Sequence, residues 1–450
     1  MNTVRVGAGS ACWVDMIEPA TELAERGELG YLCFDSMAEA TTVSMAKRKA
    51  QDPSQGYDPY LEKRFRPILP LCAKNGTKII GNMGAANPLA AQDLMIELAR
   101  ESGLKGLKIA AVLGDDILDL VQEIDPVVPE TGERVSALGD RLFAANAYIP
   151  CSPVVEALRQ GADVVITGRM GDSALFLAPL IYKFGWKEDD WDLLAGGMII
   201  GHLMECAGQV TGGYYASPPH KTVPDLHRLG FPFALVEADG TAVITKLSGT
   251  GGIVNKATCT EQLLYETHDP EEYVHADVIA DFSDIQFDEV GPDQVRVSGV
   301  RGKPSPSHLK VLLGVDDGYV GQGQIFYGGY AAYERAKLAA DRIQKRLEIV
   351  GAHPDELRID FIGVDSHFKS ADGSVGSPPR EVGVRVCGKS KDRETAELVA
   401  YEMKTLPCNG PAGGSCPPPW EAAVSEMSEG YVTFIPRDLV KPSLVIKEVT

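Results

Sequence analysis

The chain has 450 residues and a formal net charge of −20, which argues against a broad nucleic-acid-binding surface or attachment to an anionic membrane. Its hydrophobic content of 44% and charged content of 24% are those of an ordinary globular protein. The first ten residues lack the apolar segment of a secretory signal, and the apolar runs are shorter than a membrane span requires. We therefore expect a cytoplasmic protein that binds neither nucleic acid nor membrane.

The first half of the chain alternates short apolar strands with helices. The predicted strands are residues 4–9, 29–35, 77–81, 107–113, 142–148 and 163–167, and the predicted helices are residues 18–26, 60–73, 90–102 and 152–160. Such alternation predicts a parallel sheet with helices on both faces. We assign residues 1–220 to an α/β domain with this Rossmann-like arrangement.

The pattern changes in the second half. Residues 231–237 and 241–247 flank Asp239-Gly240, a strong hairpin signal, and further hairpin turns are predicted at residues 291–293 and 316–318. A long helix is predicted over residues 330–350, with strands at residues 357–364, 381–386, 431–435 and 443–446. We assign residues 221–450 to an α+β domain that is rich in antiparallel strands and packs closely against the first.

Nine cysteines are scattered through the chain without C-x-x-C spacing, so neither a disulfide framework nor a zinc cluster is predicted. Cys151 precedes a predicted helix start, where the helix dipole would lower a thiol pKa. The sequence signals no base beside it, so we interpret Cys151 as a structural cysteine.

The turn at residues 7–12 resembles a dinucleotide-binding fingerprint, with Asp35 at the end of the second strand. Cys12 occupies the third glycine position, however, and Trp13 would crowd the helix start. We therefore predict no nicotinamide site.

Polar residues follow most of the predicted strands. In open α/β sheets, ligands bind beyond the carboxyl ends of the strands. Turns also favour Asn, Asp and Gly for capping, but so many polar strand ends together favour a site. We predict that five of these residues bind substrate: Asp35, Asn82, Asn87, Asp115 and Asn146.

Residues 167–173 leave a predicted buried strand and offer a guanidinium and a carboxylate. Arg169 could clamp a substrate carboxylate with Asp172 as its orienting partner. The alternative is a structural ion pair in which Asp172 caps the next helix, and the two interpretations are compatible.

Residues 201–213 place polar groups in an apolar run. His202, Glu205 and Cys206 share one helix face, with Gln209 one turn further on. Burying them costs free energy unless they are partnered, and mutual satisfaction of His202 and Glu205 at a domain boundary is the alternative to a site. The spacing matches no known metal motif, so we assign no metal ligands, and a divalent metal stays open.

Two later glycine-rich loops, residues 246–252 and 409–414, could form anion-binding nests, although neither ends like a phosphate loop. From these loops and the preceding segment we add four candidate substrate-binding residues: Gln209, Thr211, Lys246 and Gly251.

Several long motifs occur in one order: GAGSACWVDMIEPA, YLCFDSMAEAT, GNMGAANP, DVVITGRMGDSAL and GHLMECAGQVTGG. With them the chain resembles the acyclic terpene utilisation protein A family, AtuA-like proteins, most closely over residues 4–350. The resemblance implies a late step of citronellol and geraniol catabolism, in which a branched 3-hydroxyglutaryl-CoA is cleaved to a 3-oxoacyl-CoA and acetate. It also implies a small ferredoxin-like subunit as a partner.

We therefore expect a lyase that acts on a hydroxylated carboxylate or its CoA thioester, by analogy the acetate-releasing cleavage of a 3-hydroxy-3-alkylglutaryl-CoA. The reaction needs a base for the hydroxyl and a stabiliser for the enolate. We assign Glu205 or His202 as the acid/base, Arg169 as the clamp and Asp172 as its partner.

The expected binding partner is a small-molecule substrate that can carry CoA as one moiety. We also expect the chain to form a homo-oligomer. No cofactor is required by this interpretation. Two alternatives stay open: a hydro-lyase (dehydratase or hydratase) on a similar hydroxy acid, and a non-catalytic scaffold subunit for the small partner.

Overall fold

The computed structural model describes residues 3–368, 379–416 and 423–450. The chain forms two compact units, Met1–Gly314 together with Gly430–Thr450, and Val315–Glu429. This division differs from the boundary predicted at residue 220, because strands beyond that residue extend the sheet that begins at the amino terminus. Within the described ranges, no helix combines the length and apolarity that crossing a membrane requires.

A sheet of ten strands organises the first unit. Its spatial order is β11 (Gln286–Gly291), β12 (Gln294–Ser298), β8 (Ala242–Lys246), β7 (Pro232–Glu237), β1 (Thr3–Ser10), β2 (Tyr31–Phe34), β3 (Lys78–Gly81), β6 (Val164–Thr167), β4 (Lys108–Leu113) and β19 (Ser443–Glu448). The segment from β1 to β4 is parallel, whereas β7 and β19 flank it as antiparallel strands. The prediction of an α/β fold is thus confirmed as a mixed sheet with a parallel segment.

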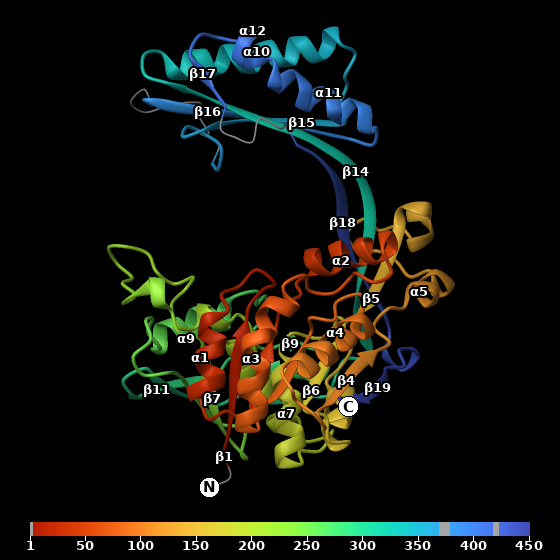
Figure 1. Cartoon of the computed structure of the whole chain (residues 1–450), viewed down its shortest axis with the longest axis vertical. Helices are drawn as coiled ribbons and strands as arrows, with labels where there is room; N and C mark the ends of the chain where they lie inside the picture. Colours follow the sequence, from red (N-terminus) through yellow and green to blue (C-terminus); the bar gives the residue numbers. More distant parts are fainter. Residues whose placement is uncertain (1–2, 369–378, 417–422) are drawn as a thin grey trace. The chain divides into compact units, whose positions relative to one another are not determined.

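Helices pack on this sheet in two layers. One contains α1 (Glu18–Arg26), α3 (Leu61–Asn75) and α4 (Pro88–Glu101), and the other contains α6 (Ser152–Arg159), α7 (Ala174–Phe184) and α8 (Trp191–Glu205). In Figure 1, α1 and α3 lie together beside β1. Helix α1 buries Leu23 on one face, carries a proline in its first turn and ends at Gly27, and its bounds are those predicted, residues 18–26.

Smaller elements complete the first unit. They are α2 (Glu39–Gln51), α5 (Leu118–Ile124), α9 (Lys256–Leu264) and the three-stranded sheet β13 (Arg301–Lys303), β10 (Ile279–Asp281) and β9 (Tyr273–Val274). The hairpins predicted at Asp239-Gly240 and at residues 291–293 are confirmed.

Two strand predictions need correction. Strand β5 (Leu142–Ala147) forms as expected but pairs with β14 (His308–Gly328) and does not join the parallel segment. The hairpin predicted at residues 316–318 is wrong, because β14 runs straight through it. From Tyr319 onward β14 pairs with β16 (Glu381–Ser390), so the residues after the expected turn pair with a distant strand and not with the residues before it.

The second unit is an antiparallel sheet with helices. Its sheet contains β15 (Glu356–Ile362), β16, part of β14 and β17 (Gly414–Ser415), with β18 (Ala423–Pro436) also paired to β14. Its helices are α10 (Ala332–Ile349), α11 (Arg393–Lys404) and α12 (Leu406–Asn409). Ile325, Ile343, Val384 and Val399 are fully buried between them. The antiparallel character predicted for the second half is confirmed here.

Candidate functional site

Polar side chains meet at the carboxyl ends of the parallel strands, as the strand-end rule predicts. Asp35 follows β2, Asn82 follows β3 and Asp115 follows β4. The Asn82 Nδ2 atom donates to Asp35 Oδ1 at 2.6 Å, and the backbone N–H of Arg169, beyond β6, donates to Asp115 Oδ2 at 2.8 Å. Asn146, at the end of β5, donates to the same Asp115 oxygen at 3.0 Å.

Asp35, Asp172 and Glu205 form a group that we call the carboxylate cluster. One oxygen of each lies within 4.8 Å of the others. The residues come from the end of β2, the turn before α7 and the last position of α8, so only the tertiary fold brings them together. Burial and the neighbouring carboxylates raise the pKa of Asp35 well above its usual range. Burial likewise raises the pKa of Asp172 to about 6, although Arg169 opposes this shift.

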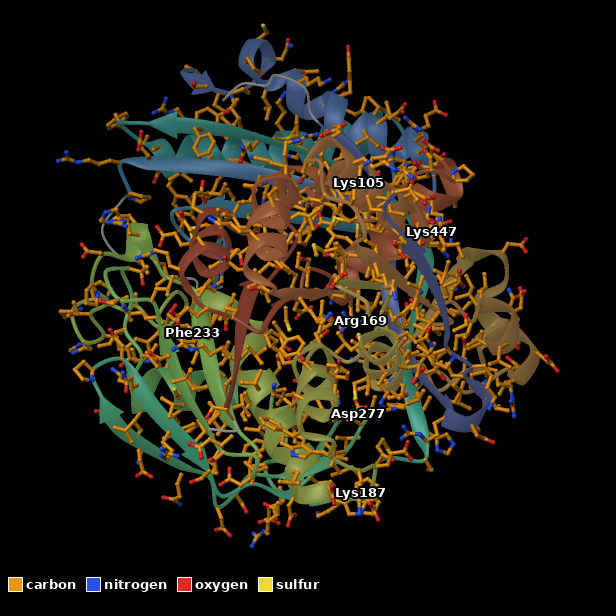
Figure 2. The ribbon with its side chains drawn as sticks, turned by 60° about the horizontal axis from the view of Figure 1, so that its bottom comes forward. Lys105, Arg169, Lys187, Phe233, Asp277 and Lys447 are labelled. Atoms are coloured by element: carbon orange, nitrogen blue, oxygen red, sulfur yellow. The ribbon has the colours of Figure 1, made fainter. Side chains whose placement is uncertain are left out.

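Arg169 is fully buried in the interior of the first unit (Figure 2). Its Nη1 atom donates to the Met37 carbonyl and its Nη2 atom pairs with Asp172 Oδ1. The guanidinium lies 4.2 Å from the centre of the Tyr148 ring, close enough for a cation–π interaction. Both terminal nitrogens are therefore engaged by the protein itself.

His202 and Ser173 hold Glu205 in place. The His202 Nδ1 atom lies 3.0 Å from Glu205 Oε1, and Nε2 lies 3.0 Å from the Leu263 carbonyl. The Tyr273 hydroxyl also lies 3.3 Å from Nδ1. Because the two nearer partners, the Glu205 carboxylate and the Leu263 carbonyl, can only accept, we assign a proton to each ring nitrogen. Burial disfavours that charge, but the hydrogen bond with Glu205 raises the pKa of His202. Ser173 Oγ donates to the other Glu205 oxygen at 2.9 Å, which leaves this carboxylate fixed at both oxygens.

Two of the predicted substrate-binding residues, Asn87 and Gln209, do not hydrogen-bond to the polar side chains at the strand ends. Asn87 caps α4 by accepting from the Ala90 N–H at 3.4 Å, and its Nδ2 donates to two carbonyls of the preceding loop. Gln209 is half-buried in a short 3₁₀ turn after α8, and its side chain makes no hydrogen bond to a described residue.

Three more predicted substrate-binding residues, Thr211, Lys246 and Gly251, hydrogen-bond to main-chain carbonyls of neighbouring segments. Thr211 Oγ1 donates to the Gly230 carbonyl at 2.7 Å. Lys246 Nζ donates to the Thr250 carbonyl at 3.0 Å, and the Gly251 N–H donates to a nearby carbonyl at 2.8 Å. None of these bonds reaches the carboxylate cluster.

Glu39 and Tyr148, which the sequence did not single out, form one side of the site together with Lys310, which the sequence offers only as part of a basic group with Arg301 and Lys303. Tyr148 hydrogen-bonds Glu39 through its hydroxyl, and Lys310 Nζ lies 3.2 Å from Glu39 Oε1 and 4.6 Å from the Tyr148 ring centre. Burial would raise the pKa of Glu39, but the charge of Arg169 and the Tyr148 bond lower it to about 2. The end of the strand at residues 142–148 is the signal that could have pointed to Tyr148.

A second missed pair lies in the loop between β9 and β10. His275 Nδ1 lies 3.4 Å from Asp277 Oδ2, and Asp277 Oδ1 accepts from the Cys151 N–H at 2.9 Å. Burial and Asp277 raise the pKa of the Cys151 thiol well above its usual range, so Cys151 is not a preformed thiolate nucleophile. The H-x-D spacing alone is too common a pattern to have identified the pair.

The model of the acyclic terpene utilisation family protein AtuA matches residues 4–446. The chain belongs to this family. The match spans nearly the whole of this AtuA-family chain and includes every residue of the carboxylate cluster. No curated protein matches the chain.

Crystal structures of homoserine dehydrogenase from S. aureus, at pH 7.5 and pH 6.0, share 10% sequence identity with this AtuA-family chain. The alignments cover 90% of this chain and 82% of the dehydrogenase, with TM-scores of 0.12 and 0.13. Similarity at this level carries no argument about fold or function.

Proposed function

We propose that the chain is a lyase acting on a hydroxylated carboxylate or its CoA thioester, with the acetate-releasing cleavage of a 3-hydroxy-3-alkylglutaryl-CoA as its reaction. The observation that carries the proposal is the convergence of the carboxylate cluster with Arg169 beyond the parallel strands, which we interpret as the ligand edge of a Rossmann-like sheet. Membership of a family named for acyclic terpene utilisation supports the substrate class.

The cleavage needs a proton acceptor in contact with the substrate hydroxyl. Loss of the hydroxyl proton forms a carbonyl as the adjacent carbon–carbon bond breaks, and the bonding pair passes to the departing acetate unit, which then takes up a proton. The Asp172 side chain is 31% exposed, whereas that of Glu205 is 6% exposed and hydrogen-bonded at both oxygens. We assign the proton acceptor to Asp172 and a supporting position to Glu205.

The geometry favours different roles for Arg169 and His202 from those predicted from the sequence. Arg169 is fully buried and its terminal nitrogens are engaged, so it orients Asp172 in place of clamping a substrate carboxylate. His202 is fully buried with both nitrogens bonded, and it therefore holds Glu205 in place of transferring a proton to substrate.

The convergence also favours an enzyme over the scaffold alternative. A scaffold subunit needs an exposed apolar surface, and it has no use for three carboxylates crowded into one buried area, since such crowding costs free energy. A hydro-lyase would use the same groups, so the products of the reaction distinguish it from the carbon–carbon lyase.

The test is to incubate the purified chain with 3-hydroxy-3-methylglutaryl-CoA and longer 3-alkyl homologues and to identify the products by mass spectrometry. A 3-oxoacyl-CoA with acetate supports the lyase, and an unsaturated acyl-CoA supports the hydro-lyase instead. Replacing Asp172 by Asn is expected to lower kcat by roughly 100-fold or more.

The matched control is Asp163→Asn. Asp163 flanks the same strand, β6, at its opposite end, and its side chain is 37% exposed and paired with Lys78 at 3.2 Å. This variant should retain turnover close to that of the wild type. Turnover that Asp172→Asn leaves intact would remove Asp172 from its assigned role.

A further inference from the structure

The spacing of the carboxylate cluster suits a single ion. Oxygen ligands lie about 2.0–2.6 Å from a bound Mg²⁺ or Ca²⁺ ion, so two ligands on opposite sides of one ion are separated by roughly 4–5 Å. The three cluster oxygens lie within 4.8 Å of one another. They therefore fit around one centre without rearrangement of the backbone.

Nearby donors orient all three carboxylates. Both oxygens of Glu205 already accept a hydrogen bond, so Glu205 would offer an ion the second lone pair of one of them. Asn82 binds Asp35 Oδ1, and Arg169 binds Asp172 Oδ1. The second oxygen of each of these two aspartates accepts no hydrogen bond from a described residue. Donors that hold one oxygen and leave the other available are the arrangement that orients metal ligands in proteins.

The three carboxylates repel one another at this spacing. Either protonation of one of them or a bound cation relieves this repulsion. A divalent cation among them would let all three stay ionised.

An independent observation also points to a ligand at this place. The His275 side chain is 10% exposed, and its Nε2 atom is buried without a hydrogen-bond partner among the described residues. Nε2 faces Gly171: a Cβ atom at that position would lie 2.4 Å from it. Gly171 directly precedes Asp172, and the imidazole is near enough to act on the Asp172 carboxyl. A buried ring nitrogen of this kind needs a partner, which water or substrate on a bound ion would provide.

We propose that Asp35, Asp172 and Glu205 bind one divalent cation of the Mg²⁺ or Mn²⁺ type, with His275 packed against Gly171, the residue before Asp172. Three carboxylate ligands select hard cations of this class. The Asp277 backbone N–H donates to His275 Nδ1 at 3.4 Å and orients the imidazole. Binding of the ion does not depend on the proposed lyase reaction. If both hold, the free Asp172 oxygen would bind the ion and would not itself take the hydroxyl proton; Asp172 would then act through the ion, which would polarise the substrate hydroxyl and lower its pKa.

The test uses Mn²⁺ alone with the full chain, by electron paramagnetic resonance and isothermal titration calorimetry. We expect one Mn²⁺ per chain, displaced by excess Mg²⁺. Asp35→Asn, Asp172→Asn and Glu205→Gln should each lower the affinity by about tenfold or more, while Asp163→Asn, which removes the same charge at the other end of β6, should leave it unchanged.

The wild-type titration decides the matter even where a variant fails to fold. Absence of saturable binding up to roughly 1 mM Mn²⁺, the weak end of protein cation sites, would overturn the proposal. Equal loss of affinity in Asp163→Asn and the cluster variants would overturn it as well. Mn²⁺ binding without turnover of any thioester would contradict the lyase proposal and support the ion site. Turnover without Mn²⁺ binding would support the lyase and contradict the ion site.

Discussion

Residues 167–172 and residues 247–252 both follow a buried strand, and both contain glycines at which a larger residue would not fit. In the first turn, a Cβ atom at Gly168 would lie 2.4 Å from the Asp115 carboxylate, and one at Gly171 would lie 2.4 Å from His275 Nε2. The obstacles in this turn are polar side chains of the candidate site.

In the second loop the obstacles belong to the main chain. A Cβ atom at Gly251 would lie 2.1 Å from the Asp225 carbonyl oxygen. Lys246, which precedes the loop, bonds the Thr250 carbonyl and lies 3.2 Å from Asp293 Oδ2. The glycines of the first turn let polar side chains of the candidate site approach the main chain. Those of the second loop let two main-chain segments pack closely.

The strongest test of this contrast removes one buried cation from each region. Arg169→Met leaves the carboxylate cluster with one compensating charge fewer, and we expect the free energy of unfolding to fall by about 3–5 kcal/mol. Lys246→Met should cost only about 1–2 kcal/mol, because its partner Asp293 is 35% exposed and can be hydrated. Denaturant unfolding measures both values, and equal losses would contradict the contrast.

The dependence of stability on pH tests the buried carboxylate beside the first turn. Burial raises the pKa of Asp115 to about 6, above its usual value of 3.8. Its protonated form therefore stabilises the folded state at about pH 4, and this contribution is lost as the pH rises through 6. The unfolding free energy of the wild type relative to Asp115→Asn should fall by about 2–3 kcal/mol over that range. Parallel stability curves for the two proteins, measured without added divalent cation, would be inconsistent with this assignment.

Double variants separate the two kinds of glycine. Gly168→Ala and Gly251→Ala should each lower the free energy of unfolding by about 1–3 kcal/mol. Truncating Asp115 to Ala removes the obstacle at Gly168, so the two substitutions should couple favourably in a double-mutant cycle. Asp225→Ala cannot relieve Gly251→Ala, because the obstacle there is a main-chain oxygen. Coupling of the same size in both cycles would refute the distinction.

The smallest expected effect concerns Thr211, which bonds the Gly208 and Gly230 carbonyls at 3.0 and 2.7 Å. Thr211→Val should cost about 1 kcal/mol of unfolding free energy and leave the affinity for Mn²⁺ unchanged. A tenfold change in that affinity would show that this segment is not separate from the carboxylate cluster.

Much of the candidate site could be predicted from local rules. Asp35, Asn82 and Asp115 were found because polar residues at the ends of parallel strands share one edge of the sheet. His275 could not be found this way, since it lies in a loop between two short antiparallel strands. Its relation to Asp172 depends on packing against Gly171, which no spacing in the sequence expresses.

Local sequence also does not distinguish an asparagine that caps a helix from one that lies in the candidate site. Asn87 follows β3 as Asn82 does, but only Asn82 contacts Asp35, whereas Asn87 caps α4. Both fates satisfy an asparagine side chain, and a turn sequence suits either one. The choice between them follows from where the chain runs after the strand.

The sequence by itself determined the elements whose stability is local: helix α1 with its proline start and glycine end, and the hairpin at Asp239-Gly240. Tertiary structure decided which distant elements meet. It paired β14 with β16 where a hairpin was expected, and it brought Asp35, Asp172 and Glu205 within 4.8 Å. Periodicity and turn residues report the preferences of neighbouring positions, whereas contacts between remote residues depend on how whole faces of the sheet and helices bury their apolar surface.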